Sequence, residues 1–141
     1  MAGQAGLSVA VCVLGIVFRG PTGAVETAAG GALMGLCALT GILGVLAHGR
    51  RLTPFPKPPA GTELIQQGIY ARIRHPLYTC NLCGFFGWAL LWGSRSALAA
   101  ALGAVFFFHV KARCEEKWLR ERFPAYRAYE KRVKRFIPGL W

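Results

Sequence analysis

Aspartate is absent from this sequence, and its 141 residues include only six acidic side chains, all of them glutamates. Catalytic triads built on Asp and carboxylate clusters for Mg²⁺ are therefore not expected. The sequence also has no GxGxxG turn, GxxxxGK[ST] loop or GxSxG elbow, so Rossmann-type, P-loop and α/β-hydrolase sites are not supported. Cysteine and histidine show no zinc-ligand spacing, so we expect no metal site.

Negative charge is scarce, whereas positive charge and apolar residues are abundant. The chain carries 17 Lys and Arg for a formal charge of +11, yet 54% of it is hydrophobic. This combination is typical of a membrane protein with basic surface segments. Basic chains also bind nucleic acid through phosphate neutralisation. The long uncharged segments favour anionic lipid headgroups as the partner and no nucleic acid.

The five cysteines are an odd number and do not form a disulfide framework. Cys80 and Cys83 form a CxxC on one face of a predicted helix. A redox pair would normally accompany a βαβ pattern, which is missing here. We therefore interpret these two thiols as small hydrophobic groups packed in the core.

Four uncharged apolar runs predict an all-α integral membrane protein with about four transmembrane helices. They cover residues 1–18, 27–49, 76–92 and 96–110. The first would form about 27 Å of helix, close to the hydrocarbon thickness. It lacks the positive n-region of a signal peptide, which favours a retained span. Gly31 and Gly35 in the second run have GxxxG spacing, which indicates either close helix packing or simple small-residue bias.

Most of the Lys and Arg lie in the loop after the second apolar run and in the C-terminal region. Cytoplasmic loops are enriched in these residues, so both termini are predicted to lie in the cytoplasm. Tyr126, Tyr129, Val133 and Phe136 share one helical face after Pro124, which predicts a C-terminal amphipathic helix. The expected single membrane domain comprises two N-terminal spans (1–49), a basic cytoplasmic loop (50–75) with an extended Pro-rich part, a helical hairpin (76–110) and a cytoplasmic C-terminal helix region (111–141).

The predicted hairpin would bring residues 68–78 and 111–116 together at its cytoplasmic end. Pro76 suits the first position of a helix, so His75 would be its cap. A helix N-terminus beside Arg72 and Arg74 can bind an anion, such as a carboxylate of a substrate or cofactor. Alternatively, the two arginines anchor to lipid phosphate and His75 is only a satisfied cap.

Glu115 and Glu116 follow closely after the fourth apolar run. A carboxylate there is costly unless it is paired or functional. Lys111 lies four residues before Glu115, and Arg113 lies three residues before Glu116. One interpretation is therefore that these residues form structural ion pairs along one helix. The other is that a glutamate holds a cation, such as an ammonium or sulfonium group.

Two sequence blocks resemble a known family. GIYARIRHPLY, beginning at Gly68, is similar to the GxYxxxRHPxY motif of isoprenylcysteine carboxyl methyltransferases, which are related to membrane phospholipid methyltransferases. CEEKWLRERFPAYRAYEKRVKRFIP, beginning at Cys114, resembles the matching C-terminal block EExxLxxxFGxxYxxYxxxVxRxxP. The two blocks cover roughly the second half of the chain, in the family's order, with an apolar hairpin between them.

The resemblance implies an S-adenosylmethionine-dependent methyltransferase whose lipophilic acceptor (a carboxylate, thiol or amine) arrives from the bilayer. It implies that the glutamate pair and the basic residues ahead of it act at the reaction site. Lys111 stands where the prenylcysteine enzymes have Arg, with Arg113 close by, and Pro124 replaces a usual Gly. The resemblance places candidate catalytic groups at Glu115, Lys111 and Arg113, and cofactor contacts at Glu63, Leu64, Ile65, Tyr70, His75, Pro76, Leu77, Tyr78, Glu115 and Glu116.

Two other functions fit parts of the same pattern. Sterol reductases share a similar RHPxY-containing C-terminal half, which would make this chain an NADPH-dependent membrane reductase, although those enzymes are longer. A non-enzymatic four-span interaction protein with a lipid-binding basic tail would bind no cofactor. The lack of intramembrane charge argues against ion transport.

Overall fold

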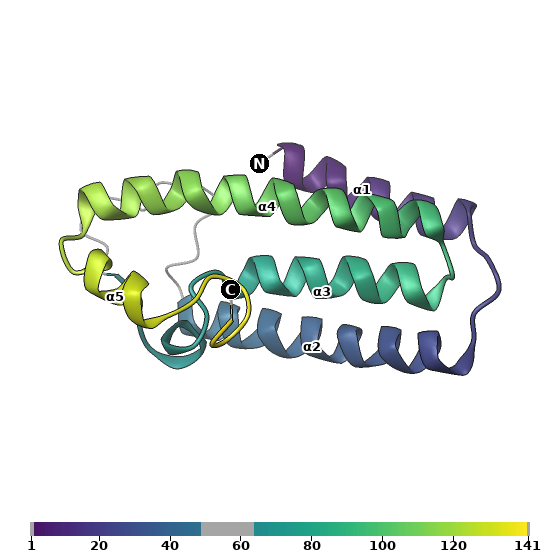
Figure 1. Ribbon diagram of the computed structural model, residues 1–141, viewed down its shortest axis with the longest axis horizontal. Coiled ribbons are helices and arrows are strands. Elements are labelled where there is room, and N and C mark those ends of the chain that lie inside the picture. Colours follow the sequence, from purple (N-terminus) through teal and green to yellow (C-terminus); the bar gives the residue numbers. More distant parts are fainter. Residues whose placement is uncertain (1, 49–63, 141) are drawn as a thin grey trace. The chain divides into compact units, whose positions relative to one another are not determined.

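The computed structural model describes residues 2–48 and 64–140, and these ranges form an all-α fold without strands. The all-α part of the predicted fold class is therefore confirmed. The Pro-rich part of the basic loop lies outside the described residues. The elements are α1 (Ala2–Val17), α2 (Ala24–His48), the 3₁₀-helix η2 (Gly68–Ala71), α3 (Pro76–Leu91), α4 (Arg95–Arg122) and α5 (Tyr126–Arg132) (Figure 1).

The chain divides into two compact units. The first contains Met1–Leu39 and Cys80–Phe107, and the second contains Thr40–Thr79 and Phe108–Trp141. Helices α2, α3 and α4 each contribute residues to both units. The two segments that the sequence singled out for chemistry both belong to the second unit.

Helix starts follow from local sequence. The Gly23 N–H donates to the Glu26 carboxylate at 2.8 Å, the reciprocal half of a capping box, at the start of α2. The Ser94 hydroxyl accepts the N–H of Ala97 at 3.2 Å and so caps α4. Helix α3 begins at Pro76, whose missing N–H costs nothing in a first turn.

Close glycine contacts join α2 and α3 in the first unit, but not through the predicted GxxxG pair. A Cβ on Gly30 would lie 3.1 Å from the Gly87 carbonyl, whereas one on Gly31 or Gly35 would meet nothing within 4 Å. Among the described residues, the GxxxG pair lies on an exposed face of α2 and makes no close helix contact. Beside the Gly30 contact, the sulfur atoms of Cys37 and Cys80 lie 3.5 Å apart, which agrees with packed thiols.

Membrane-spanning character is clearest in two helices. Among the described residues, Ala24–Ala47 and Arg95–Arg122 are long and apolar enough to cross a bilayer, and α1 is a shorter apolar helix. The large apolar side chains that remain exposed suit a lipid environment. On α1, α2 and α4 they include Val9, Val13, Ile16, Leu39, Ile42, Leu46, Leu102 and Phe106.

The C-terminal region differs from the single amphipathic helix predicted there. Helix α4 continues to Arg122, and α5 is a separate helix of seven residues. Pro124 lacks the N–H that a continuous helix needs, and it lies between the two. From Val133 the backbone is extended, because residues 134 and 135 pair with 74 and 75 through main-chain hydrogen bonds of 2.8 and 3.0 Å.

The predicted apolar face of the C-terminal region is nevertheless buried. Tyr126, Tyr129 and Val133 form a core cluster in the second unit. Leu64, Leu119 and Phe123 pack against this cluster. The cluster positions the chain that follows α5 beside the start of α3.

Candidate functional site

His75 lies immediately before α3, where the sequence placed the helix cap. Its carbonyl oxygen accepts the N–H groups of Tyr78 at 3.0 Å and Thr79 at 3.1 Å. Its own N–H donates to the carbonyl of Arg135. The C-terminal segment thus occupies one of the free amide groups on which the predicted anion site depended.

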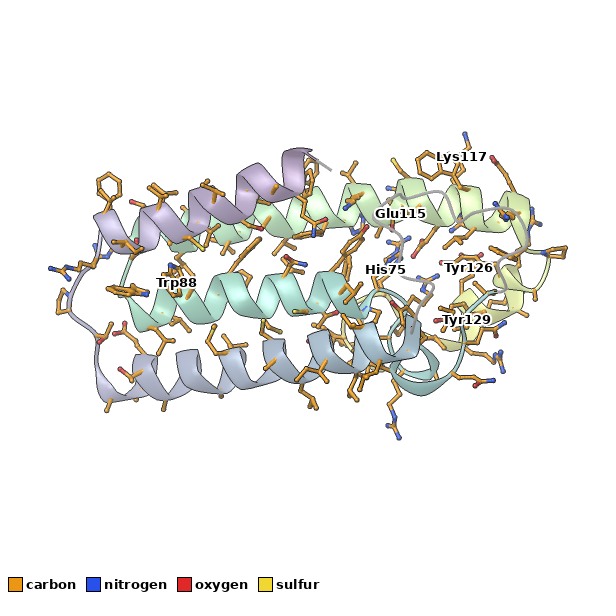
Figure 2. All side chains as sticks on the ribbon, turned by 180° about the vertical axis from the view of Figure 1, so that it is seen from behind. His75, Trp88, Glu115, Lys117, Tyr126 and Tyr129 are labelled. Atoms are coloured by element: carbon orange, nitrogen blue, oxygen red, sulfur yellow. The ribbon has the colours of Figure 1, made fainter. Side chains whose placement is uncertain are left out.

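Glu115 meets the start of α3 through two side chains. The Tyr78 hydroxyl donates a short hydrogen bond to Glu115 Oε1, and His75 Nδ1 lies 3.7 Å from Glu115 Oε2. The rings of His75 and Tyr78 are stacked, with centroids 5.2 Å apart. Figure 2 shows His75, near the start of α3, next to the part of α4 that carries Glu115. Glu115 therefore clusters with two residues that lie 37 and 40 positions earlier in the sequence.

The two basic candidates, Lys111 and Arg113, have different positions in the structure. The Lys111 ammonium lies over the Tyr78 ring, 4.8 Å from its centroid, which is cation–π geometry. Lys111 therefore belongs to the same cluster. Arg113 is exposed, on a different face of α4.

Glu116 is enclosed by cations that the sequence interpretation did not assign to it. Its side chain is 0% exposed. Arg135 donates to both carboxylate oxygens through Nε at 2.9 and 3.1 Å and Nη2 at 2.7 Å. Arg74 Nη2 lies 3.3 Å from Oε1, and Arg120 Nη2 lies 3.6 Å from Oε2. Arg74 therefore neutralises protein carboxylates, which neither the anion-site nor the lipid-anchor interpretation expected.

Glu130 extends this ion-pair network to α5. Arg120 donates to it through Nε and Nη2, the shortest distance being 2.8 Å, and Arg74 Nη1 lies 3.5 Å away. The Arg120 hydrogen bonds, with the charges of Arg120 and Arg74, outweigh burial and lower the pKa of Glu130. Hydrogen bonding to Glu116 likewise raises the pKa of Arg135. Both groups are therefore charged at neutral pH.

Two tyrosines connect η2 with α5. The Tyr129 hydroxyl donates to the Tyr70 carbonyl at 2.6 Å. Burial raises the pKa of Tyr129 to about 12. Burial, together with the nearby Tyr129 and Glu115, raises the pKa of Tyr70 even more. Both phenols stay neutral and can only hydrogen-bond or pack. Figure 2 shows Tyr126 and Tyr129 together on α5.

The other residues predicted to bind the cofactor do not share one environment. Glu63 lies outside the described residues. Leu64 and Ile65 are partly buried ahead of η2, and Leu64 packs on the tyrosine cluster. Pro76 is fully buried, whereas Leu77 packs near Gly44 of α2.

Sequence reasoning missed Arg120, Glu130 and Arg135 as partners of the candidate site. It considered only the ion pairs of Glu115 and Glu116 with the preceding Lys111 and Arg113. Arg120 lies four residues after Glu116 on the same helix, whereas Arg74 and Arg135 come from other segments. One signal was present, since Arg135 is the arginine of the VxR pattern in the C-terminal block. Its role requires the extended chain after α5, which periodicity did not predict.

Known proteins match most of this chain. The family model described as phospholipid methyltransferase matches residues 25–126. Two curated relatives are the cobalt-zinc-cadmium resistance protein CzcN of Cupriavidus metallidurans, 35% identical over 78 residues, and the nickel-cobalt-cadmium resistance protein NccN of Alcaligenes xylosoxydans xylosoxydans, 38% identical over 81 residues. The matches cover 55% and 56% of this chain, but only 36% and 38% of the relatives.

The family match includes α3, α4 and nearly all of α2, and thus His75, which precedes α3, and Glu115 and Glu116 on α4. It covers more than two thirds of the chain. The chain therefore belongs to the phospholipid methyltransferase family, a family of membrane methyltransferases.

Proposed function

We propose that this protein is an S-adenosylmethionine-dependent methyltransferase that acts at the cytoplasmic membrane face on a lipophilic acceptor. The observation that carries the proposal is the environment of Glu115. Its carboxylate is held by the Tyr78 hydroxyl and faces His75, yet 18% of the side chain remains exposed. A carboxylate has about four acceptor positions, so Glu115 can still bind a ligand.

The residues around Glu115 fit the charges of the cofactor. S-adenosylmethionine carries a sulfonium and an ammonium group at its amino-acid end, together with a carboxylate. Glu115 and the Tyr78 ring suit the cations, and the Lys111 ammonium suits a carboxylate of the cofactor or of an acceptor. We assign Tyr70, Pro76 and Leu77, with Glu63, Leu64 and Ile65, to the surrounding pocket.

Little acid–base chemistry is required of the protein. The cofactor supplies an electrophilic methyl group on a sulfonium centre. The residues of the chain bind and orient the reactants and exclude water. Orientation alone can lower a barrier by about 7–11 kcal/mol. This role agrees with a cluster whose tyrosines stay neutral and whose buried arginines are paired.

The surfaces agree with a substrate that comes from the bilayer. Apolar side chains are exposed on α1, α2 and α4, and basic side chains are exposed on and after α5. The basic side chains would contact anionic lipid headgroups. They are Arg127, Lys131, Arg132 and Lys134.

Calorimetry with S-adenosylmethionine in detergent tests the proposal. Glu115→Gln should weaken binding about 10- to 100-fold, since hydrogen bonds to charged groups contribute roughly 1.5–3 kcal/mol. His75→Ala should also weaken it. Glu121→Gln, an exposed glutamate on the same helix, is the matched control and should bind like the wild type.

Wild-type affinity in both Glu115→Gln and His75→Ala would remove these residues from the cofactor site. Binding of NADPH without binding of S-adenosylmethionine would replace the proposal with a membrane reductase. Binding of neither would favour a non-enzymatic membrane protein.

A further inference from the structure

Two cysteines from different helices of the first unit lie next to each other. Cys37 is on α2 and Cys80 is on α3, and their sulfur atoms are 3.5 Å apart. The CxxC pattern pairs Cys80 with Cys83 on one helix, whereas the sulfur that lies beside Cys80 comes from another helix. The two residues are 43 positions apart in the sequence, so only the folded chain makes them neighbours.

Helix packing holds the two thiols close together. Gly30 and Gly87 contact each other across the same two helices, because a Cβ on Gly87 would lie 3.0 Å from the Gly30 carbonyl oxygen. Cys37 lies seven residues after Gly30, and Cys80 lies seven residues before Gly87. Seven residues are about two helical turns, so both contacts follow one antiparallel register of α2 and α3 (Figure 1). The thiol pair is therefore part of an ordered helix contact.

The geometry also leaves the sulfur atoms room to react with each other. Gly84 lies one turn after Cys80, and a Cβ there would lie 3.1 Å from the Cys37 sulfur. Glycine at this position thus keeps the space around the Cys37 thiol open. The sulfurs are 3.5 Å apart and a disulfide bond is about 2.0 Å long, so they need to approach by about 1.5 Å. Small rotations about the Cα–Cβ bonds of the two cysteines supply this movement.

An oxidant can reach the pair from the lipid. Both thiols are half-buried rather than enclosed. Leu36 and Leu39, close to Cys37 on α2, are 43% and 54% exposed. Because α2 is long and apolar enough to cross a bilayer, these leucines suit contact with acyl chains. The oxidant that fits this position is a small molecule that dissolves in or crosses the membrane, such as a hydroperoxide.

We propose that Cys37 and Cys80 form an oxidation site, at which a hydroperoxide converts the two thiols into a disulfide that joins α2 to α3. One sulfur attacks the peroxide and its O–O bond breaks, which gives a sulfenic acid and an alcohol. The second sulfur attacks the sulfenic sulfur, the S–S bond forms, and the hydroxide leaves with the thiol proton as water. The two thiols lose two electrons in all, and one hydroperoxide is reduced.

Peptide mass spectrometry of the full chain in detergent tests this site without any methyl donor. The reduced protein is treated with tert-butyl hydroperoxide, its remaining thiols are alkylated, and it is digested without reductant. Peptides joined through Cys37 and Cys80 are expected, and dithiothreitol should separate them. Cys37→Ser should abolish this crosslink. Cys83→Ser, one turn from Cys80 on the same helix, is the matched control and should keep it.

Unfolding the protein in sodium dodecyl sulfate and urea before oxidation checks that the fold selects the pair. Mixed cysteine pairs should then replace the single crosslink, and the same selectivity in the unfolded chain would overturn the proposal. A wild-type crosslink between Cys80 and Cys83, or none at all, would also overturn it. Cys80→Ala provides a second route if Cys37→Ser does not fold, and a Cys37 crosslink to another residue that equals the wild-type yield would again contradict the assigned pair.

Discussion

At the residue scale, neighbouring glutamates have different roles because of their direction on one helix. Consecutive residues point about 100° apart around a helix axis. Glu116 consequently faces the arginines, while Glu115 faces Tyr78 and stays partly exposed. Sequence alone could locate the acidic pair, but it could not divide their roles, because Arg74 and Arg135 come from segments distant in sequence.

Glu130 makes the stability of the second unit depend on pH. Its pKa is lowered from the ordinary 4.5, so its ion pair with Arg120 stabilises the folded state above about pH 4.5. This contribution disappears as the pH falls through the lower folded-state pKa. Because the pair is partly exposed, we expect only about 0.5–1 kcal/mol.

Thermal denaturation in detergent tests this dependence. Glu130→Gln should melt a few degrees below the wild type at pH 6 to 7, with the difference shrinking below about pH 4.5. Glu121→Gln should melt like the wild type at each pH. An equal difference for Glu130→Gln at pH 7 and pH 3 would contradict the ion-pair explanation.

At the element scale, helix starts were more predictable than helix contacts. Pro76 marked the start of α3, because proline suits a first turn whatever surrounds it. The break around Pro124 and the extended chain after α5 depend on partners in the 73–75 segment, which no local pattern reveals. The glycine of α2 that contacts α3 is Gly30, which lies outside the GxxxG pair for which the sequence left close packing and small-residue bias open.

Two adjacent glycines of α2 test this contact. Gly30→Val should destabilise the protein by about 1–3 kcal/mol, because a Cβ there would lie 2.9 Å from Leu91 Cγ. Gly31→Val changes the helix propensity by the same amount as Gly30→Val, but its Cβ would meet nothing within 4 Å. Gly31→Val is therefore the matched control. Equal melting temperatures of the two variants would contradict the assigned contact.

At the scale of the whole molecule, helix length and hydropathy separate α2 and α4 from the shorter α1 and α3. The sequence predicted about four spans, and two described helices meet the length and hydropathy expected of one. Helices α1 and α3 have 16 residues each, about 24 Å of helix, so spanning would require local bilayer thinning.

Cysteine labelling in a cysteine-free background tests the four-span topology. A cysteine at Thr22, before α2, or at Arg95, at the start of α4, should react with an impermeant reagent outside intact cells. A cysteine at Lys131, on α5, should react only after permeabilisation. Labelling of a cysteine at Lys131 in intact cells would contradict the predicted topology.

The clamp between Arg135 and Glu116 also has a consequence for biosynthesis. The ribosome adds Glu116 19 residues before Arg135, so the glutamate emerges first. At about 5–20 residues per second, this delay lasts roughly one to four seconds. Glu116 can therefore form its closest ion pair only after the chain has been made through Arg135 and has folded back against α4, so the clamp is completed later than the helix that carries Glu116.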